Sequence, residues 1–219
     1  MGWPRWERLI GPFQDAKISC TLVSAKRATS NQGVTKADIR RAMRTRLAVL
    51  GPERVEKSQL IVAAIAAHPR VAGRGRMALF SPLPSEPDVE GIWKMVSGPF
   101  CYPRVVRGEM EFVDVGSMAD LATSPWHPKI REYGDPAARI VPPAEIDVIL
   151  VPGLAFTGGG QRLGRGGGYY DRYLASLPAK TLKIGVCFGF QIVGTLPTES
   201  HDQAVDAVAT EAGFQAETT

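Results

Sequence analysis

Apolar residues recur at helical spacing from residue 35 onward. Four of them fall on one face of a helix: Ile39, Met43, Leu47 and Leu50. Thr35 and Asp38 have the spacing of a capping box at the start of this helix, and Gly51-Pro52 follows its end. A second helix is expected over about residues 53–67, because a proline at 69 stops the helical pattern. Its apolar run, which we expect to be mostly buried, consists of Leu60, Ile61, Ala64 and Ile65.

Beyond residue 76 the pattern changes to short apolar segments that alternate with helical ones. Strands are predicted at residues 77–80, 101–106, 111–115, 146–151, 183–188 and 205–210. Helical faces are predicted around residues 89–96 and at 169–177, and residues 117–144 are predicted to form a long irregular connection. Continuous apolar strands between helices are typical of a mostly parallel sheet covered on both faces. We therefore predict a single-domain α/β fold, a three-layer α/β/α sandwich, over residues 34–215.

Residues 1–33 show no sustained period and end in a polar stretch. They are predicted to form an N-terminal extension that need not belong to the core. A transit peptide, an upstream start and a genuine tail are all compatible with their composition, so their purpose stays open.

Composition narrows the class of protein. The chain has 219 residues, of which 44% are hydrophobic and 22% charged, as in an ordinary globular domain. It contains no apolar stretch of the length that spans a bilayer and no signal-like apolar region near its start. Three widely spaced cysteines show no metal-ligand spacing and favour a reducing compartment. We expect a soluble cytoplasmic protein.

Charge is distributed unevenly along the chain. Residues 1–76 carry 15 Lys or Arg against 5 Asp or Glu, whereas residues 77–219 carry 11 against 17. This distribution predicts that the cationic first part of the chain contacts an anion. A nucleic-acid backbone and a triphosphate are both possible anions, and composition does not choose between them.

A glycine-rich turn between residues 156 and 169 is the most informative segment. Seven of the eleven residues from Gly158 to Gly168 are glycine, and they lie between a predicted buried strand and a predicted helix. Ligands of α/β sheets bind at the carboxyl ends of strands, where backbone amides of such a turn and a helix N-terminus favour an anion. Arg162 and Arg165 add guanidinium groups that suit phosphate.

The turn differs from the best-known phosphate loops. It has no GK[ST] sequence and no G-x-G-x-x-G register. A flexible surface loop with basic residues is the alternative interpretation. Ordering seven glycines costs conformational entropy, which favours a functional reason for keeping them.

Three basic residues form a stripe on the first helix. Lys36, Arg40 and Arg44 are spaced four apart, and like charges at this spacing destabilise a helix by roughly 0.2–0.5 kcal/mol per pair. An anionic partner would remove that repulsion. From these residues alone, a merely solvated face is the more usual explanation of such a stripe.

The glycine-rich segment PGLAF…RLGRGGGYYDRYL, at residues 152–174, resembles the signature of the 5-formyltetrahydrofolate cyclo-ligase family. Further similarity runs through KADIR at 36–40, FSPLPSEPDVEGI at 80–92, YPRV at 102–105 and PTESHDQAVDAVATE at 197–211. The resemblance therefore covers about residues 35–211 in the order of the family.

The resemblance implies roles for individual residues. Catalytic roles fall to Lys36, Arg40 and Arg162. The ATP contacts would be Lys36, Arg40, Arg162, Leu163, Gly164, Arg165, Gly166, Gly167, Gly168, Tyr169 and Tyr170. The folate contacts would be Ser81, Glu86, Trp126, Arg165, Gly166, Gly167, Gly168 and Tyr169, and the magnesium ligands Asp171 and Asp202. Arg44 is assigned no role.

Several of these residues also have ordinary structural interpretations. Asp171 is placed to complement a helix dipole, and Asp202 lies in a turn where Asp often bonds its own backbone. Glu86 lies where helix-capping acids are common, and a loop tryptophan such as Trp126 often covers a core, although a pterin ring would stack on it.

The implied reaction converts 5-formyltetrahydrofolate to 5,10-methenyltetrahydrofolate with ATP and Mg²⁺, through phosphorylation of the formyl oxygen. The implied partners are small molecules, with no nucleic acid or membrane, and a monomer is expected. Two alternatives are kept. One is a nucleotide- or RNA-binding module without turnover, although no aromatic-interleaved basic motif appears. The other is a different ATP-dependent kinase or ligase.

Overall fold

The computed structural model describes residues 34–73, 75–125 and 127–215. By its internal contacts the chain divides into two units, residues 1–33 and residues 34–219. The predicted extension at 1–33 lies outside the described residues, and every helix and strand named below belongs to the second unit.

A mixed β-sheet forms the middle layer of this unit. Its strand order is β12-β11-β10-β7-β1-β2-β3-β6. The bounds are β12 Gly213–Gln215, β11 Ala207–Thr210, β10 Leu182–Val186, β7 Val148–Pro152, β1 Met77–Ala78, β2 Phe100–Val106, β3 Glu109–Val115 and β6 Ile140–Val141. Neighbours from β11 to β2 pair in parallel, and the outer pairs β11–β12, β2–β3 and β3–β6 are antiparallel. The predicted α/β fold is confirmed, with parallel pairing in the centre of the sheet.

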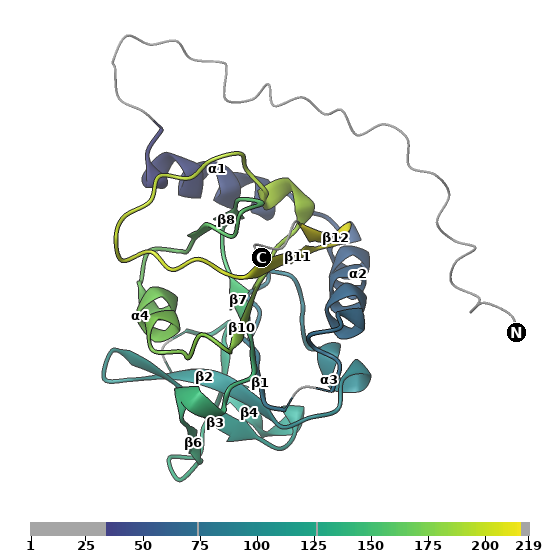
Figure 1. Cartoon of the computed structure of the whole chain (residues 1–219), viewed down its shortest axis with the longest axis vertical. Coiled ribbons are helices and arrows are strands. Elements are labelled where there is room, and N and C mark those ends of the chain that lie inside the picture. Colours follow the sequence, from purple (N-terminus) through teal and green to yellow (C-terminus); the bar gives the residue numbers. More distant parts are fainter. Residues whose placement is uncertain (1–33, 74, 126, 216–219) are drawn as a thin grey trace, which may run out of the picture. The chain divides into compact units, whose positions relative to one another are not determined.

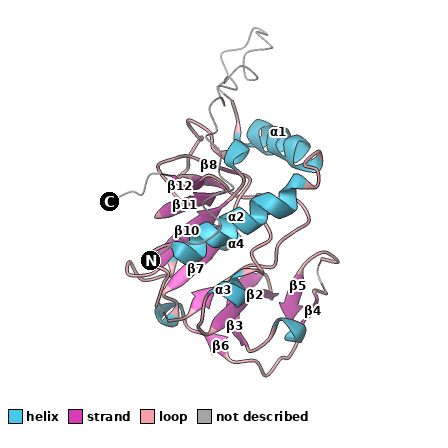
Figure 2. Cartoon of the chain, turned by 90° about the vertical axis from the view of Figure 1, so that its right-hand side faces the viewer, coloured by secondary structure: helices cyan, strands magenta, loops and turns pink. Residues whose placement is uncertain are grey.

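Helices cover both faces of the sheet, as Figures 1 and 2 show. The helices are α1 Lys36–Ala48, α2 Glu53–Ala67, α3 Ile92–Met95 and α4 Tyr169–Ala175. Successive residues of β7 point to opposite faces: Val148 and Leu150 join a core with α1, α2 and α3, whereas Ile149 and Val151 join a second core with α4. This alternation explains why β7 is apolar throughout. The three-layer sandwich is therefore as predicted.

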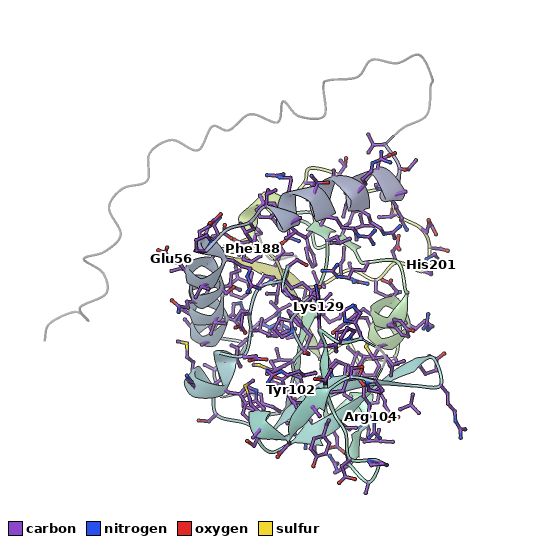
Figure 3. The ribbon with its side chains drawn as sticks, turned by 180° about the vertical axis from the view of Figure 1, so that it is seen from behind. Glu56, Tyr102, Arg104, Lys129, Phe188 and His201 are labelled. Carbon is purple, nitrogen blue, oxygen red and sulfur yellow. The ribbon has the colours of Figure 1, made fainter. Side chains whose placement is uncertain are left out.

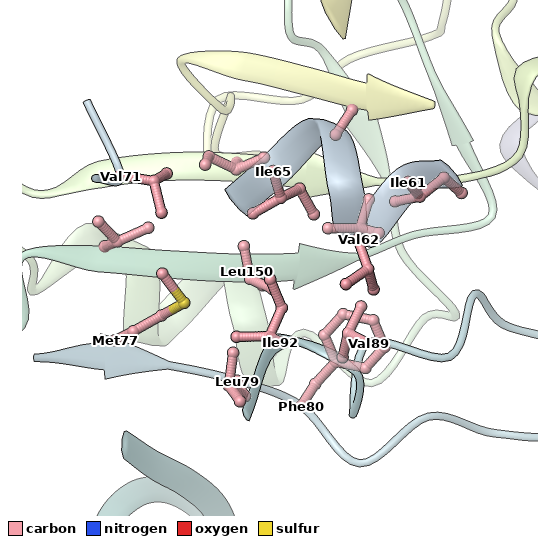
Figure 4. Close-up of a cluster of buried hydrophobic side chains, with 14 of the residues drawn as sticks. Ile61, Val62, Ile65, Val71, Met77, Leu79, Phe80, Val89, Ile92 and Leu150 are labelled. Carbon is pink, nitrogen blue, oxygen red and sulfur yellow. The ribbon is translucent and has the colours of Figure 1, made fainter. Parts of the chain in front are cut away.

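The larger core packs α2 against the sheet (Figure 4). Ile61, Val62 and Ile65 turn inward toward Leu150 and Ile92, and all five side chains are buried. Burial of one such side chain contributes roughly 1.5–3 kcal/mol. The neighbouring Leu60 was predicted to be buried but is 49% exposed. It lies one residue, and hence about 100° of helix rotation, from Ile61, which turns it toward solvent.

Helix α1 begins as its sequence predicts. The Thr35 hydroxyl accepts a hydrogen bond from the Asp38 amide at 3.2 Å, and the Asp38 carboxylate accepts one from the Thr35 amide at 3.3 Å. Met43 and Leu47 are buried beneath the helix, and the other two residues of the apolar stripe are half-buried. Because the cap and the stripe are both local patterns, the sequence alone fixes this element.

The prediction of an irregular connection over residues 117–144 is wrong. This segment contains η2 Met118–Asp120, β4 Leu121–Thr123, β5 Arg131–Tyr133, β6 and η3 Pro143–Glu145. Strands of two or three residues are too short to show a period-2 pattern. The hairpin of β8 Ala155–Phe156 and β9 Arg162–Leu163 was missed for the same reason, and the 3-10 turn η4 Gly189–Gln191 was not predicted either. Of the helical face predicted around residues 89–96, only α3, Ile92–Met95, is helical.

Side chains fill the space between the helical layers and the sheet (Figure 3). Tyr102 is fully buried there, and Trp93 donates a hydrogen bond from its indole nitrogen to the Tyr102 hydroxyl at 3.0 Å. Cys101 and Cys187 are also buried, and both are free thiols. Within the described residues, no helix has the length and apolar character needed to cross a bilayer.

Candidate active site

A glycine loop, defined here as residues 158–168, follows β8, contains β9 and leads into α4. Gly166 and Gly168 have φ angles of 109° and 68°, in a region that side-chain-bearing residues rarely adopt. Gly168 is the N-cap of α4. The sequence therefore keeps glycine at these two positions because the backbone conformation requires it.

Four consecutive backbone amides in the second half of this loop are open. The N–H groups of Arg165, Gly166, Gly167 and Gly168 donate to no acceptor within the described parts of the chain. Since α4 has only seven residues, its dipole adds little, and the loop amides are the main backbone donors for an anion. This is the local geometry that the glycine pattern predicts.

Helix α1 passes beside β8 (Figure 1), and two residues of its basic stripe contact the glycine loop. The Arg40 Nε atom donates to the carbonyl oxygen of Gly164 at 3.0 Å. The guanidinium of Arg44, to which no role was assigned, donates from Nη2 to the carbonyl oxygen of Arg165 at 3.3 Å. The predicted juxtaposition of the first helix and the glycine loop is therefore present.

Lys36, at the start of α1, lies against the segment that precedes β11. Its ammonium Nζ is 2.9 and 2.7 Å from the two carboxylate oxygens of Asp202 and 3.2 Å from Oε1 of Glu199. Burial opposes both charges, but the hydrogen bonds outweigh it, so the pKa of Lys36 is raised and the pKa of Asp202 is lowered. Both side chains are therefore firmly charged at neutral pH.

Arg162 is the most buried cation of the site, with a side chain that is 2% exposed. Its Nη2 atom lies 2.6 Å from Oδ1 of Asp171, and Nη1 donates to the carbonyl oxygen of Pro152 at 3.2 Å. The Nε atom is buried and has no hydrogen-bond partner in the described residues. The amide of Gln203 also donates to Oδ1 of Asp171, at 3.3 Å, so the chain next to Asp202 lies beside Asp171.

Arg165 reaches from the glycine loop to the segment that follows β1. Its Nε atom is 2.9 Å from Oε1 of Glu86, and its Nη2 atom is 3.2 Å from the hydroxyl of Ser85. Oε2 of Glu86 accepts a hydrogen bond from the Leu83 amide at 2.9 Å, which orients the buried carboxylate. A predicted folate residue and a predicted ATP residue are thus in direct contact.

Other predicted residues lie around this contact. Ser81 is buried, and its hydroxyl accepts a hydrogen bond from the Arg131 amide of β5 at 2.8 Å. Tyr169 is 38% exposed, with Arg172 stacked over its ring at 5.2 Å, whereas Leu163 is buried. Burial, and to a smaller extent Glu86, raise the pKa of Tyr170. Trp126 lies outside the described residues.

The two carboxylates predicted as magnesium ligands come from adjacent segments, but each is paired with a cation. In the described parts of the chain, no group of three His, Cys, Asp or Glu side chains could hold a metal ion by itself. Magnesium in nucleotide sites is held by one or two carboxylates together with phosphate oxygens and water. Oδ2 of Asp171 makes no hydrogen bond to a described residue, so the donor set fits an ion that arrives with a phosphate.

Sequence reasoning missed four residues of the arrangement: Arg44, Glu199, Gln203 and Arg172. For Arg44 the signal was present, because the helical spacing places it on the stripe with Lys36 and Arg40. Glu199 and Gln203 carry no local signal, because they join the site only when their segment folds across it. His201, in the same segment, has a side chain that is 66% exposed and lies at the margin of the molecule (Figure 3).

The fold and the site define an α/β protein that gathers a glycine loop and three cation–carboxylate pairs beside its sheet: Lys36–Asp202, Arg162–Asp171 and Arg165–Glu86. A sequence profile of the 5-formyltetrahydrofolate cyclo-ligase family matches residues 32–211. The chain belongs to this family, and the resemblance inferred from its motifs is confirmed.

Individual relatives agree with this assignment. The chain is 31% identical to the 5-formyltetrahydrofolate cyclo-ligase of Mus musculus over 203 residues, which cover 87% of this chain and 96% of the relative. It is 31% identical to the enzyme of the same name from Escherichia coli K12 over 177 residues, or 77% and 96% of the two chains. These relatives support an enzyme of the cyclo-ligase type and do not favour the RNA-binding alternative.

Solved structures are similar too. The 5,10-methenyltetrahydrofolate synthetase of Aquifex aeolicus superposes with a TM-score of 0.71 at 30% identity, covering 82% of this chain and 91% of that one. A synthetase of the same name from Mycoplasma pneumoniae superposes with a TM-score of 0.64 at 23% identity, covering 81% and 99%, and supports the fold.

Proposed function

We propose that this protein catalyses the ATP-dependent cyclisation of 5-formyltetrahydrofolate to 5,10-methenyltetrahydrofolate, with release of ADP and phosphate. The observation that carries the proposal is the set of open amides at 165–168 beside Lys36, Arg40 and Arg162. The names of the relatives supply the substrate class.

The triphosphate of ATP would bind at the glycine loop. Open amides would hold phosphate oxygens, and the three cations would balance the negative charge. The buried Nε of Arg162 supports this, because an unpaired donor at such depth is costly unless an acceptor arrives. Leu163, Tyr169 and Tyr170 would frame the nucleotide from β9 and α4.

The folate would bind on the side of the Arg165–Glu86 contact. Glu86 is oriented by the Leu83 amide, and the charged pair would place it close to the reacting phosphate. Ser81 would extend the proposed folate contacts toward β5, and Trp126 stays a proposed folate contact from its place in the sequence. Because Arg165 touches both proposed sites, it would align the two substrates.

The reaction needs no covalent group from the protein. The formyl oxygen attacks the γ-phosphorus of ATP, the bond to the β-phosphate oxygen breaks, and ADP leaves. The resulting iminium phosphate is attacked at carbon by N10, which loses its proton. The carbon–oxygen bond then breaks, and phosphate leaves. Phosphoryl transfer of this kind is catalysed mainly by positioning and charge stabilisation, which Lys36, Arg40 and Arg162 supply.

Asp171 and Asp202 would hold Mg²⁺ together with phosphate oxygens. The ion would supply charge neutralisation between the phosphates. Both carboxylates are paired with cations in this structure, so the proposal includes a change of partners when Mg·ATP binds. We also propose a cytoplasmic monomer that acts on small molecules, without nucleic acid or membrane; light scattering on the purified protein tests the monomer.

The test is a near-ultraviolet assay for the methenyl product, with ATP present or omitted. The wild-type protein is expected to form product only with ATP, and Lys36→Met is expected to lose most of this turnover. Arg41→Met is the matched control, because Arg41 lies on the same helix but pairs only with the exposed Asp38. ATP consumption without methenyl product would contradict the proposal and favour another ATP-dependent kinase or ligase. Salt-sensitive RNA binding without turnover would replace it by a binding module.

A further inference from the structure

Two arginines of α1 hold consecutive carbonyl groups of the glycine loop. Arg40 donates to Gly164 O at 3.0 Å, and Arg44 donates to Arg165 O at 3.3 Å. Residues four apart on a helix lie on the same face, so the two guanidinium groups are spaced along the loop. A third arginine, Arg172 of α4, donates to Gly167 O at 3.4 Å. In every case the protein uses a carbonyl of the loop and leaves the amides open.

This pattern determines the direction of the amides. All described peptide bonds are trans, and in a planar trans peptide the N–H points opposite to the C=O. The peptide that carries Arg165 O also carries the N–H of Gly166, and the peptide that carries Gly164 O carries the N–H of Arg165. With both carbonyls turned toward α1, both N–H groups point away from it. Neither has an acceptor in the described chain.

We propose that Arg44 is a positioning residue for the nucleotide: by holding Arg165 O, it aims the N–H of Gly166 at a phosphate oxygen. A loop with seven glycines has many conformations of similar energy, and φ of 109° at Gly166 is one of several open to it. The hydrogen bond from Arg44 to the Arg165 carbonyl restricts the loop conformation before ATP binds, which lowers the entropic cost of binding. This inference rests on the proposed function and adds a residue to it.

The experiment compares Arg44→Ala with Arg46→Ala. Arg46 is the matched control, because it lies on the same helix and donates from Nη1 to a carbonyl outside the glycine loop, Phe190 O of η4, at 3.1 Å. We expect Arg44→Ala to raise KM for ATP about fivefold, as the loss of one hydrogen bond predicts, with KM for the folate unchanged. Arg46→Ala should leave KM for ATP within about twofold of wild type. Arg44→Lys keeps a donor and should recover part of the loss.

Two further measurements separate positioning from other roles. If Arg44 acted only by attracting ATP at long range, high salt would abolish the difference between Arg44→Ala and wild type; positioning predicts that the difference persists. Trypsin cleavage after Arg165, followed by mass spectrometry without ATP, should be faster in Arg44→Ala than in wild type or Arg46→Ala. Equal cleavage in all three, or a KM difference that high salt removes, would overturn the proposal.

Calorimetry of ATP binding distinguishes failure of this inference from failure of the proposed function. If wild type binds Mg·ATP and Arg44→Ala binds it equally well, the inference is wrong and the function stands. If wild type binds no ATP, the proposed function itself fails. Weaker binding by Arg44→Ala, with normal binding by Arg46→Ala, supports both.

Discussion

The ammonium of Lys36 lies 2.7 and 2.9 Å from the carboxylate oxygens of Asp202, a residue 166 positions further along the chain. The same kind of pairing joins Arg162 to Asp171 and Arg165 to Glu86. Three of the four cations that the proposal assigns to phosphate or folate therefore already have an anionic partner, whereas Arg40 donates to the neutral carbonyl of Gly164. An arriving phosphate must compete with these carboxylates, which ties nucleotide binding to a rearrangement of the site.

The first prediction concerns pH. The lowered pKa of Asp202 means that its pairing stabilises the fold above the ordinary value of 3.8 and is lost as the pH falls below it. The raised pKa of Lys36 means that the contribution is present below 10.5 and is lost as the pH rises beyond it. Asp202→Asn should therefore lower Tm by about 2–4 °C near neutrality, and by less at either extreme.

Thermal unfolding of wild type and Asp202→Asn across the pH range checks this prediction. Glu56→Gln serves as the control, because Glu56 is exposed on α2 and makes no ion pair or hydrogen bond to a described residue. A difference in Tm between wild type and Asp202→Asn that stays constant down to pH 3 would contradict the pairing.

The second prediction concerns Asp171→Asn. The change leaves the buried guanidinium of Arg162 without its anion and removes a proposed magnesium ligand. Turnover should fall at least about 100-fold, and the free energy of unfolding by about 1–3 kcal/mol, because asparagine keeps one acceptor. Initial rates and urea unfolding measure the two effects. Full activity of Asp171→Asn would refute the metal assignment.

The variant Cys187→Ser should keep most turnover, since burial raises the pKa of this thiol and keeps it unreactive.

The third prediction is a double-mutant cycle on Glu86 and Arg165. The Arg165 side chain is 35% exposed, so solvent screens the pair and the coupling free energy should be about 0.5–1 kcal/mol in urea unfolding. In kinetics, Glu86→Gln should raise KM for 5-formyltetrahydrofolate more than KM for ATP, whereas Arg165→Gln should raise both. Strictly additive free energies would show that the contact seen here does not couple the two segments.

The fourth prediction concerns Gly160, which has a φ of 82°. A Cβ atom here would lie 2.2 Å from the carbonyl oxygen of Val205, whose amide donates to Gly160 O at 2.9 Å. Gly160→Ala should therefore lower the free energy of unfolding by about 2 kcal/mol or more. Gly158→Ala is the matched control, because no atom lies within 4 Å of its Cβ position, and its effect should stay within about 1 kcal/mol. Equal stability of the two variants would show that this close approach is unimportant.

Much of the fold could be predicted because its signals are local. The cap at Thr35, the stripe through Met43 and Leu47, and the apolar run of β7 all depend on neighbours in the chain. The strands β4, β5, β6 and β12 could not be predicted in this way. They have two or three residues each, and the strands they pair with, rather than their own periodicity, hold them in place.

For the site, the sequence by itself determined the chemical groups: a glycine loop after a buried strand, a basic stripe on a helix, and carboxylates within recognisable motifs. Only the tertiary structure decided their partners. Glu86 meets Arg165 across 79 residues, and Arg44 holds a carbonyl 121 residues away. Backbone conformation and helical periodicity are set by adjacent residues, whereas an ion pair or a held carbonyl exists only after packing has brought distant segments within hydrogen-bond distance.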